Sequence, residues 1–349
     1  MARREKPAHL SAPAEGSAFK EIEAVPSSGK TERLRLRAAW MYFVEQMTQS
    51  EIAEALDIGR VTVVRLLADA RARYEVRISV VGELAELTSL ERRLEERFGL
   101  DRAIVAPLSQ AGRDPVPPIS AAAGAFLSEA VQAGMVVGLG WGRTLHQSLS
   151  FLAERSLENL RVISLLGGVA QARRFNPAEF VWRFAQAFGG EAYLLAAPAI
   201  VDSLETKRAL IERCGLGPIM AMADSLDLVV VSVGGLDPKA TTARVGYMTE
   251  EVRKSLVEAG AVGDLLFHFF DRNGELVDHR LNELVVSVGL DRIRAAKLRV
   301  LVSGGIEKVE ALVGGMALVE PNVFITDEAS ARAMLALAGE TRPTLAKAG

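Results

Sequence analysis

Two glycine-containing segments carry the residue types best suited to binding an anion or a hydroxyl-rich ligand. In the first, MVVGLGWGRTLHQSL (135–149), a short apolar run leads into glycines, Arg143 and Thr144. The glycines of this loop are Gly138, Gly140 and Gly142. Backbone N–H groups at a glycine-rich turn before a helix can approach a bound anion closely. The glycines could equally serve only to allow a tight strand-to-helix turn, and the loop alone favours neither interpretation.

The second segment, SGGIEKVEAL (303–312), repeats the pattern of an apolar strand, two glycines and a helix start, and it adds Lys308. A lysine in the first turn of a helix is unfavourable because the helix dipole is positive there. A bound anion would compensate, although an exposed lysine that is merely solvated is the alternative. Together the two segments predict a site for one phosphate or a few sugar hydroxyls.

The spacing of these residues argues against a nucleotide cofactor or a metal ion. The loop reads G-x-G-x-G-x-T, whereas dinucleotide sites have G-x-G-x-x-G and triphosphate loops have G-K-[ST]. The four histidines lie far apart, with no pair at i and i+4, and they are His9, His146, His268 and His279. We therefore expect no cofactor and no metal.

The segments that must position these residues alternate in character beyond residue 100. Short apolar runs that often end in glycine are separated by helix-length segments. The runs are RAIVAP, MVVGLG, RVISLLGG, AYLLAAP, LDLVVVSVGG, RVLVSGG and NVFITD. This alternation predicts βαβ units and an α/β domain with a mostly parallel sheet. In such a sheet the ligand lies beyond the carboxyl ends of the strands, where these glycines gather.

The segment TQSEIAEALDIGRVTVVRLLADARARY (48–74) has the organisation of a helix-turn-helix. Thr48 and Glu51 form a capping box that starts a first helix, and the DIG turn leads into a second helix. The second helix directs four apolar residues inward, namely Val63, Leu66, Leu67 and Ala70. In a helix-turn-helix the second helix lies in the DNA major groove. A helical hairpin packed only for stability is the alternative.

The DNA contacts expected of this module come from the starts of both helices. Arginine can bind guanine or phosphate, and threonine can contact either. The candidate DNA-binding residues are Thr48, Gln49, Arg60, Val61, Thr62 and Arg65. Between Arg60 and Arg77 five arginines oppose Asp69 and Glu75, so the segment is basic within a chain whose net charge is -3. A basic strip on a mildly acidic protein suits a site-specific DNA binder.

This module resembles the DNA-binding end of the SorC family of bacterial sugar-responsive regulators, whose pattern is close to Q-x-E-I-A-x-x-L-x-I-S-R-x-T-V-S-R-L-L. The matching positions are Gln49, Glu51, Ile52, Ala53, Leu56, Ile58, Arg60, Thr62, Val63, Arg65, Leu66 and Leu67. Gly59 stands where a capping serine is usual, which weakens the cap by about a few tenths of a kcal/mol. Val64 replaces a serine expected near DNA, and a valine side chain has no hydroxyl with which to contact it.

The resemblance to the SorC family extends over residues 35–338 in all. Its further marks are LLGG (165–168), VVSVGGLDP (230–238), GAVGDLLFHFFDRNG (260–274), LNELVVSVGL (281–290) and PNVFITDEASARAML (321–335). It implies a winged helix-turn-helix followed by a Rossmann-like α/β effector domain, related to glucosamine-6-phosphate deaminases and sugar-phosphate isomerases. The candidate effector-binding residues are Gly138, Gly140, Gly142, Arg143, Thr144, Gly167, Gly168, Asp264 and Lys308.

That kinship raises the alternative of an enzyme acting on a sugar phosphate, which would need a base at carbon and an acid at oxygen. Where the deaminase pattern carries D-G-H, this chain reads LDPK (236–239), without a histidine. His268 and His279 lie in other segments. The carboxylates that could orient hydroxyls are Asp264, Asp278 and Glu283. The binding residues are present and the reactive ones are not, so the sequence predicts a ligand sensor.

The domain boundaries follow from these segments. We expect a mobile tail (1–30), the helix-turn-helix domain (31–80), a linker helix (81–100), the effector domain (101–340) and a second tail (341–349). The first domain begins with an amphipathic helix whose apolar stripe is Leu36, Ala39, Trp40 and Phe43, and it ends with EVRISV, which alternates like a strand. The leucine stripe of the linker helix could pair with another copy of itself.

The sequence is thus interpreted as a transcriptional regulator of a carbohydrate or polyol catabolic operon. Its expected partners are double-stranded operator DNA and a sugar, sugar phosphate or polyol effector. At least a homodimer is expected because one recognition helix reads too few base pairs, and the family resemblance suggests a homotetramer. One cysteine, Cys214, and the lack of an apolar run of ~18 residues predict a cytoplasmic protein without membrane spans.

Overall fold

The chain divides into two compact units, Met1–Val76 and Arg77–Gly349, which we call the helical unit and the α/β unit. The structure is a computed structural model, and it describes residues 27–73, 75–76, 85–108, 110, 112–169, 176–238, 240, 242 and 248–340. Most of the first predicted tail, the second predicted tail and residues 77–80 of the predicted strand lie outside these ranges. Glu75 and Val76 are described, and neither belongs to a strand.

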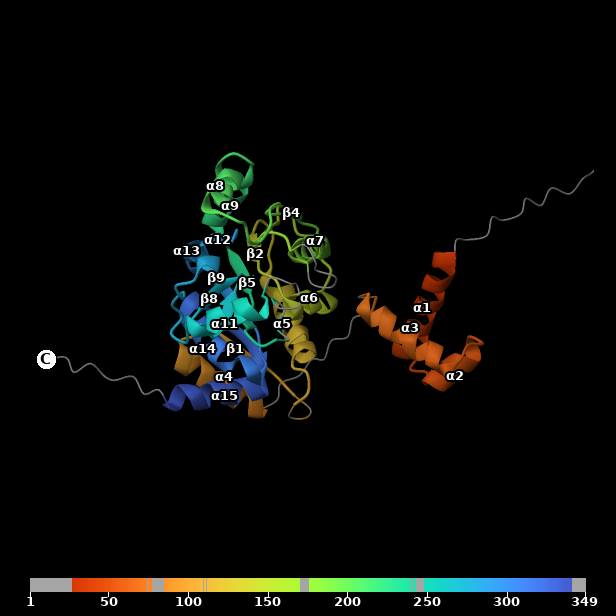
Figure 1. Ribbon diagram of the computed structural model, residues 1–349. Coiled ribbons are helices and arrows are strands. Elements are labelled where there is room, and N and C mark those ends of the chain that lie inside the picture. The colour runs from red at the N-terminus through yellow and green to blue at the C-terminus, as the bar shows by residue number, and fades with distance from the viewer. Residues whose placement is uncertain are drawn as a thin grey trace, which may run out of the picture. The chain divides into compact units, whose positions relative to one another are not determined.

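The helical unit consists of α1 (Ser27–Phe43), α2 (Gln49–Ala55) and α3 (Arg60–Ala72) (Figure 1). The four residues predicted to face inward from α3, Val63, Leu66, Leu67 and Ala70, are all buried. They pack with Ile52 of α2 and with Ala38 of α1 around a small apolar core. The helix-turn-helix pairing predicted for α2 and α3 is therefore confirmed, and α1 begins at Ser27, within the predicted tail.

The predicted inner stripe of α1 is only partly correct. Leu36 and Trp40 are 43% and 59% exposed, whereas Ala38 is fully buried. Alanine lets α1 approach α3 closely, and a tryptophan in the same place would hold the helices apart. The buried side of α1 also carries Arg35, whose Nε donates a 2.6 Å hydrogen bond to the carboxylate of Glu75.

The α/β unit is built on a seven-stranded sheet in the order β1-β10-β9-β5-β2-β3-β4, and every neighbouring pair is parallel. The strands are β1 (Arg102–Ala106), β2 (Val136–Leu139), β3 (Arg161–Ser164), β4 (Glu191–Tyr193), β5 (Leu228–Val231), β9 (Leu298–Val302) and β10 (Val323–Asp327). This confirms the predicted Rossmann-like architecture. The chain moves outward from β2 to β4 and then returns to place β5 on the other side of β2, so the strand order reverses between β2 and β5.

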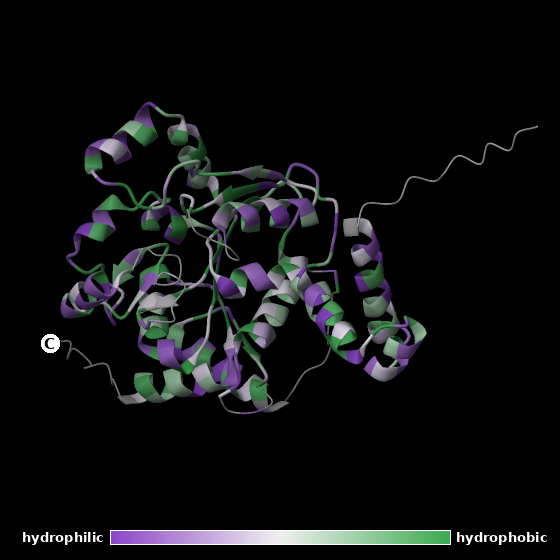
Figure 2. Cartoon of the chain, turned by 45° about the vertical axis from the view of Figure 1, so that its right-hand side comes forward, coloured by the Kyte–Doolittle hydropathy of each residue, from purple (hydrophilic) through white to green (hydrophobic). Residues whose placement is uncertain are grey.

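Helices cover both faces of this sheet. One face packs on α5 (Val116–Ala130), α6 (Arg143–Ser148) and α7 (Pro177–Ala187), and the other packs on α4 (Ala85–Phe98), α14 (Val309–Val319) and α15 (Glu328–Glu340). The remaining helices are α8 (Leu204–Glu212), α9 (Leu216–Met222), α11 (Glu250–Glu258), α12 (Arg280–Leu284) and α13 (Leu290–Ala295), with 3-10 turns at Leu149–Phe151, Ala223–Ser225 and Ile306–Lys308. Hydrophobic and hydrophilic residues alternate along these helices (Figure 2), as expected when one side of each helix meets a core.

The predicted linker helix is an integral part of the α/β unit. Leu87, Leu90 and Leu94 of α4 are buried in its core, and α4 lies next to α15 (Figure 1). Glu91 and Glu95 accept 2.9 Å hydrogen bonds from the N–H groups of the edge strand β1. The leucine stripe of α4 is therefore buried inside the α/β unit, where α4 packs on β1. It is not available to pair with another copy of the chain.

A three-stranded antiparallel sheet, which the sequence analysis did not anticipate, adjoins the end of β5. It consists of β6 (Gly234–Gly235), β7 (Gly263–Leu265) and β8 (His268–Phe270). Among the described residues, no helix is both long and apolar enough to cross a bilayer.

Candidate functional site

A cavity of about 570 Å³ lies at the carboxyl ends of the central strands of the α/β unit. Its walls come from the segments that follow β2, β5 and β9, and from β7. The strand order reverses between two of these strands, and open α/β sheets bind ligands at such a reversal. The topology therefore places the cavity where a ligand site is expected.

The floor of the cavity is the glycine pair Gly234–Gly235 of β6. A Cβ at Gly234 would collide with Oδ1 of Asp264, and a Cβ at Gly235 would lie 3.3 Å from Cγ of Lys308. A side chain at Gly234 would thus crowd the Asp264 carboxylate, and one at Gly235 would press on the aliphatic part of Lys308.

Asp264 is the most deeply buried ionisable group that lines the cavity, with an exposed fraction of 3%. Its Oδ2 accepts a 3.1 Å hydrogen bond from the Phe267 N–H, and its Oδ1 has no partner among the residues that the structure describes. Burial raises the pKa of Asp264 to about 6, although the Phe267 N–H and the charge of Lys308 act to lower it. A buried acceptor of this kind costs free energy unless a donor reaches it.

A strained turn holds Asp264 in place. Leu266 and Phe267, which join β7 to β8, have φ angles of +54° and +63°, which are unusual for residues other than glycine. Both side chains are buried, and the Phe267 ring stacks on Trp141 of the cavity wall at 5.1 Å. Apolar burial thus compensates for a turn whose Phe267 N–H points at the Asp264 carboxylate.

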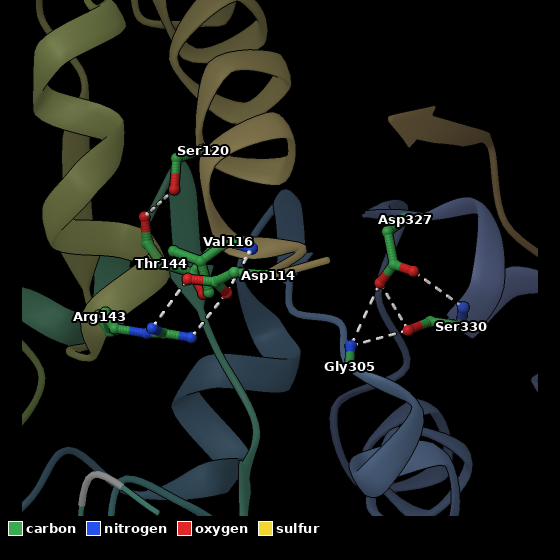
Figure 3. Close-up of polar contacts among 8 residues, drawn as sticks. All are labelled: Asp114, Val116, Ser120, Arg143, Thr144, Gly305, Asp327 and Ser330. Carbon is green, nitrogen blue, oxygen red and sulfur yellow. Dashed lines mark hydrogen bonds and ion pairs between the residues drawn. The ribbon is translucent and has the colours of Figure 1, made fainter. Parts of the chain in front are cut away.

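Lys308 is positioned by a buried polar network beneath the turn that precedes α14. Gly305, with φ +116°, donates its N–H to Oδ2 of Asp327 (3.1 Å) and to Oγ of Ser330 (2.7 Å) (Figure 3). The Lys308 N–H then donates to the Gly305 carbonyl at 2.9 Å. Burial lowers the pKa of Lys308 and the charge of Arg143 lowers it further, whereas the nearby carboxylates raise it.

Arg143 and Thr144 form the first turn of α6 on the other side of the cavity. Gly142, with φ +132°, makes the turn into this helix, and the Thr144 carbonyl accepts a 2.9 Å hydrogen bond from Ser120 of α5. The Arg143 guanidinium forms two hydrogen bonds with the carboxylate of Asp114, at 2.9 and 3.0 Å (Figure 3). The arginine therefore lines the cavity while it is engaged in an ion pair.

In the helical unit the candidate DNA-binding side chains lie on the open side of α3. Arg60 and Arg65 are exposed, Val61 is 84% exposed, and Thr62 is half-buried. The capping box of α2 is present, since the Thr48 N–H donates to Glu51 (2.7 Å) and the Glu51 N–H donates to Thr48 Oγ1 (3.3 Å). Gln49 follows as the first residue of α2, and Gly59 caps α3 without a side-chain hydrogen bond.

Comparison with known proteins identifies the family. The family model described as "Putative sugar-binding domain" matches residues 82–336. The erythritol catabolism regulatory protein EryD of Brucella abortus is 30% identical over 307 residues, which cover 87% of this chain and 96% of that protein. The crystal structure of the full-length sorbitol operon regulator SorC of Klebsiella pneumoniae superposes with a TM-score of 0.66 at 25% identity, covering 87% and 98% of the two chains. The chain belongs to the SorC family.

A further relative, the deoxyribonucleoside regulator of Bacillus subtilis, is 30% identical over 312 residues, or 87% of this chain and 97% of that protein. These SorC-family relatives are transcriptional regulators and not enzymes. The chain is accordingly a transcriptional regulator with a sugar-binding domain, as the sequence predicted, and the enzyme alternative is not supported.

The candidate effector-binding residues of this SorC-family chain separate into two groups. Those that line the cavity are Gly142, Arg143, Thr144, Asp264 and Lys308. Those that are not among its lining residues are Gly138, Gly140, Gly167 and Gly168. The sheet therefore brings together the polar candidates from three distant segments, but only one of the candidate glycines.

The four candidate glycines that are not among the lining residues have packing or backbone roles in the structure. Gly138 lies within β2, where a Cβ would press on the side chains of Leu165 and Leu226. A Cβ at Gly167 would lie 2.7 Å from the Ala197 carbonyl oxygen. Gly140 and Gly168 donate their N–H groups to backbone carbonyls at 2.8 and 2.7 Å, so these donors are already used.

Several lining residues were not among the sequence-based candidates. They are Trp141, Ser232, Val233, Gly234, Gly235, Asp237, Pro238, Ala240, Thr242 and Glu307. The segment VVSVGGLDP (230–238), which ends a strand-like run with two glycines and an aspartate, was the available signal. Its role depends on β6, a strand of two residues that no periodicity in the sequence could reveal.

His268, His279 and the other candidate carboxylates are not among the lining residues. His268 is buried, with Nε2 at 2.8 Å from Oγ of Ser287, and burial together with the charge of Lys207 lowers its pKa to about 4. His279 caps α12 by accepting a 3.3 Å hydrogen bond from the Leu281 N–H. Both histidines thus make structural hydrogen bonds, and neither Asp278 nor Glu283 is among the residues that line the cavity.

Proposed function

We propose that the cavity binds a sugar, sugar phosphate or polyol, and that its occupancy changes how the helical unit binds operator DNA. The observation that carries this proposal is that Asp264 and Lys308 both line the cavity beside the glycine pair Gly234–Gly235. The buried Oδ1 of Asp264 can accept a hydrogen bond from a ligand hydroxyl, and the Lys308 ammonium can donate one. Charge-assisted hydrogen bonds of this kind are the stronger ones in proteins.

The names of the relatives support a carbohydrate or polyol catabolic operon as the target. One is a regulator of erythritol catabolism, another is a sorbitol operon regulator, and a third is a deoxyribonucleoside regulator. All three ligand classes implied by these names carry two or more hydroxyl groups. The cavity supplies carboxylates, hydroxyls and an ammonium group from four segments, which is the set of groups that hydroxyl-rich ligands need.

For DNA we propose the exposed side of α3, with Arg60, Val61, Thr62 and Arg65, assisted by Thr48 and Gln49 at the start of α2. A single recognition helix covers few base pairs, so the regulator would act as a homodimer or homotetramer on paired half-sites of double-stranded operator DNA. This function belongs to the cytoplasm, where bacterial DNA lies.

Regulation then requires that the effector binds two arrangements of the protein with different affinity. By thermodynamic linkage, operator DNA must change effector affinity by the same factor. This reciprocity gives the proposal a measurable consequence beyond simple binding of either partner.

The test begins with a thermal-shift screen of polyols, sugars and sugar phosphates on the full chain. The strongest ligand is then titrated into a complex of the protein with a duplex from its own promoter region. Lys308→Met should weaken ligand binding by about tenfold to 100-fold and leave ligand-free DNA binding unchanged, because it removes a charge-assisted hydrogen bond. Lys254→Met, at an exposed position of α11, is the matched control. If Lys308→Met responds at the wild-type ligand concentration, the effector site lies elsewhere.

A further inference from the structure

Arg143, which lines the cavity, forms an ion pair with Asp114 in which both side chains are partly exposed to solvent (Figure 3). Nη1 and Nη2 of Arg143 each donate to a different carboxylate oxygen, at 3.0 and 2.9 Å. Asp114 is not a lining residue, but its Oδ1 also accepts a 3.2 Å hydrogen bond from the Val116 N–H at the start of α5. The carboxylate is thus fixed by α5 in the position where it meets the guanidinium.

A carboxylate in this position competes with a phosphate for the same donors. The planar guanidinium binds carboxylate and phosphate in the same two-point geometry. A phosphorylated ligand that approaches the Nη1–Nη2 edge of Arg143 must therefore displace Asp114 from both hydrogen bonds. The released carboxylate stays close because α5 holds it, and it would repel the bound phosphate.

The other charges of the cavity add to this effect. Among the described lining residues the second cation is Lys308, whereas Asp237, Asp264 and Glu307 are acidic. With Arg143 engaged by Asp114, acceptors for hydroxyl groups outnumber the positive charges that a phosphate would need. Such a cavity suits a ligand that donates hydrogen bonds and carries no negative charge.

We propose that Asp114 is a specificity-determining residue: by holding Arg143, it makes the cavity favour an uncharged polyol or sugar over the corresponding phosphate ester. This inference rests on the proposed function, because it takes the cavity as the effector site. Asp114 acts by engaging Arg143 and through the charge of its own carboxylate, and it is not among the residues that line the cavity. Its replacement by asparagine should therefore change the preference for charge more than the affinity for hydroxyl groups.

Inorganic phosphate is a suitable probe, since it carries the charge in question and requires no knowledge of the effector. The full chain is titrated with sodium phosphate at constant ionic strength, and binding is followed by calorimetry. Asp114→Asn retains an oxygen that can accept from the Val116 N–H, and it should bind phosphate about tenfold more tightly than the wild type. Adding Arg143→Gln to this variant should abolish the gain. Asp224→Asn, which breaks an exposed pair with Arg292 at 2.6 Å, is the matched control and should gain nothing.

Three results would overturn the inference. They are equal phosphate affinity in the wild type and Asp114→Asn, a gain that survives the loss of Arg143, and an equal gain in Asp224→Asn. Failure of the proposed function would look different, because no polyol, sugar or sugar phosphate in the screen would then bind to the wild type, whatever the phosphate titration gave.

Discussion

The helical unit and the α/β unit present their functional side chains in opposite ways. In the helical unit, Arg60, Val61 and Arg65 are exposed on one helix and lie within six consecutive positions of the sequence. In the α/β unit, Asp264 and Lys308 are drawn from separate segments and meet Thr144 in a cavity at the sheet edge. The first arrangement needs only a helix whose spacing puts these residues on its exposed side. The second needs the whole sheet, because its residues come from distant segments.

This difference has a physical origin in the two kinds of partner. A DNA groove is wide and highly charged, and a helix reads it with side chains that protrude into solvent. A small hydroxyl-rich ligand must be surrounded, so its site requires groups from several directions and removes them from water. Removal from water is what raises the pKa of Asp264 and lowers that of Lys308.

The largest effect is expected where the α/β unit depends on long-range packing. Gly234→Ala would place a Cβ against Oδ1 of Asp264 and displace the carboxylate from the cavity. Effector affinity should fall by roughly 100-fold, because a charged hydrogen bond is lost and the floor is filled. Gly339→Ala is the control, since a Cβ there meets nothing within 4 Å. Isothermal titration with the effector found in the screen measures both variants, and unchanged affinity in Gly234→Ala would show that the glycine floor is not part of the site.

A smaller effect is expected in the helical unit, where each exposed side chain of α3 would contact DNA by itself. Arg65→Ala should weaken operator binding by about 1–3 kcal/mol, without altering the affinity of the isolated protein for its effector. Arg208→Ala, at an exposed position of α8 in the α/β unit, should leave both affinities unchanged. Fluorescence anisotropy with a labelled operator duplex checks this prediction. An Arg65→Ala variant with full operator affinity would remove this side of α3 from the DNA interface.

The smallest effect is the pH dependence of effector affinity. It is expected for the cavity, which contains the buried Asp264, and not for the exposed arginines of α3. The pKa of Asp264 is raised in the folded protein to about 6 from a usual 3.8, so protonated Asp264 favours folding and this contribution is lost as pH rises through about 6. An effector hydroxyl that donates to the ionised carboxylate should bind less tightly below about pH 6, by at most tenfold per pH unit. Asp264→Asn should remove this pH dependence, and it should also stabilise the ligand-free protein at neutral pH. A wild-type affinity that is constant between about pH 5 and pH 8 would contradict this role of Asp264.

The sequence permitted much of the α/β fold and some of the cavity to be predicted. The apolar runs that end in glycine marked β2, β5 and β9, and two of them pointed directly to Arg143, Thr144 and Lys308. The same pattern also selected Gly138 and Gly167, on which other segments of the same chain pack closely. A glycine near a strand end has the same appearance in a sequence whether a ligand or another backbone approaches it.

Local sequence alone determined the helix-turn-helix, its capping box and the buried positions of α3, because helical periodicity and capping depend on residues within a few positions of one another. Only the tertiary structure decided that α4 belongs to the core, that Asp114 engages Arg143, and that Asp264 lies over Gly234. These contacts join residues about 30 apart, as in α6 with Asp114, or farther along the chain. Their formation depends on the order of strands in the sheet, which the crossover connections set and which no short segment of sequence contains.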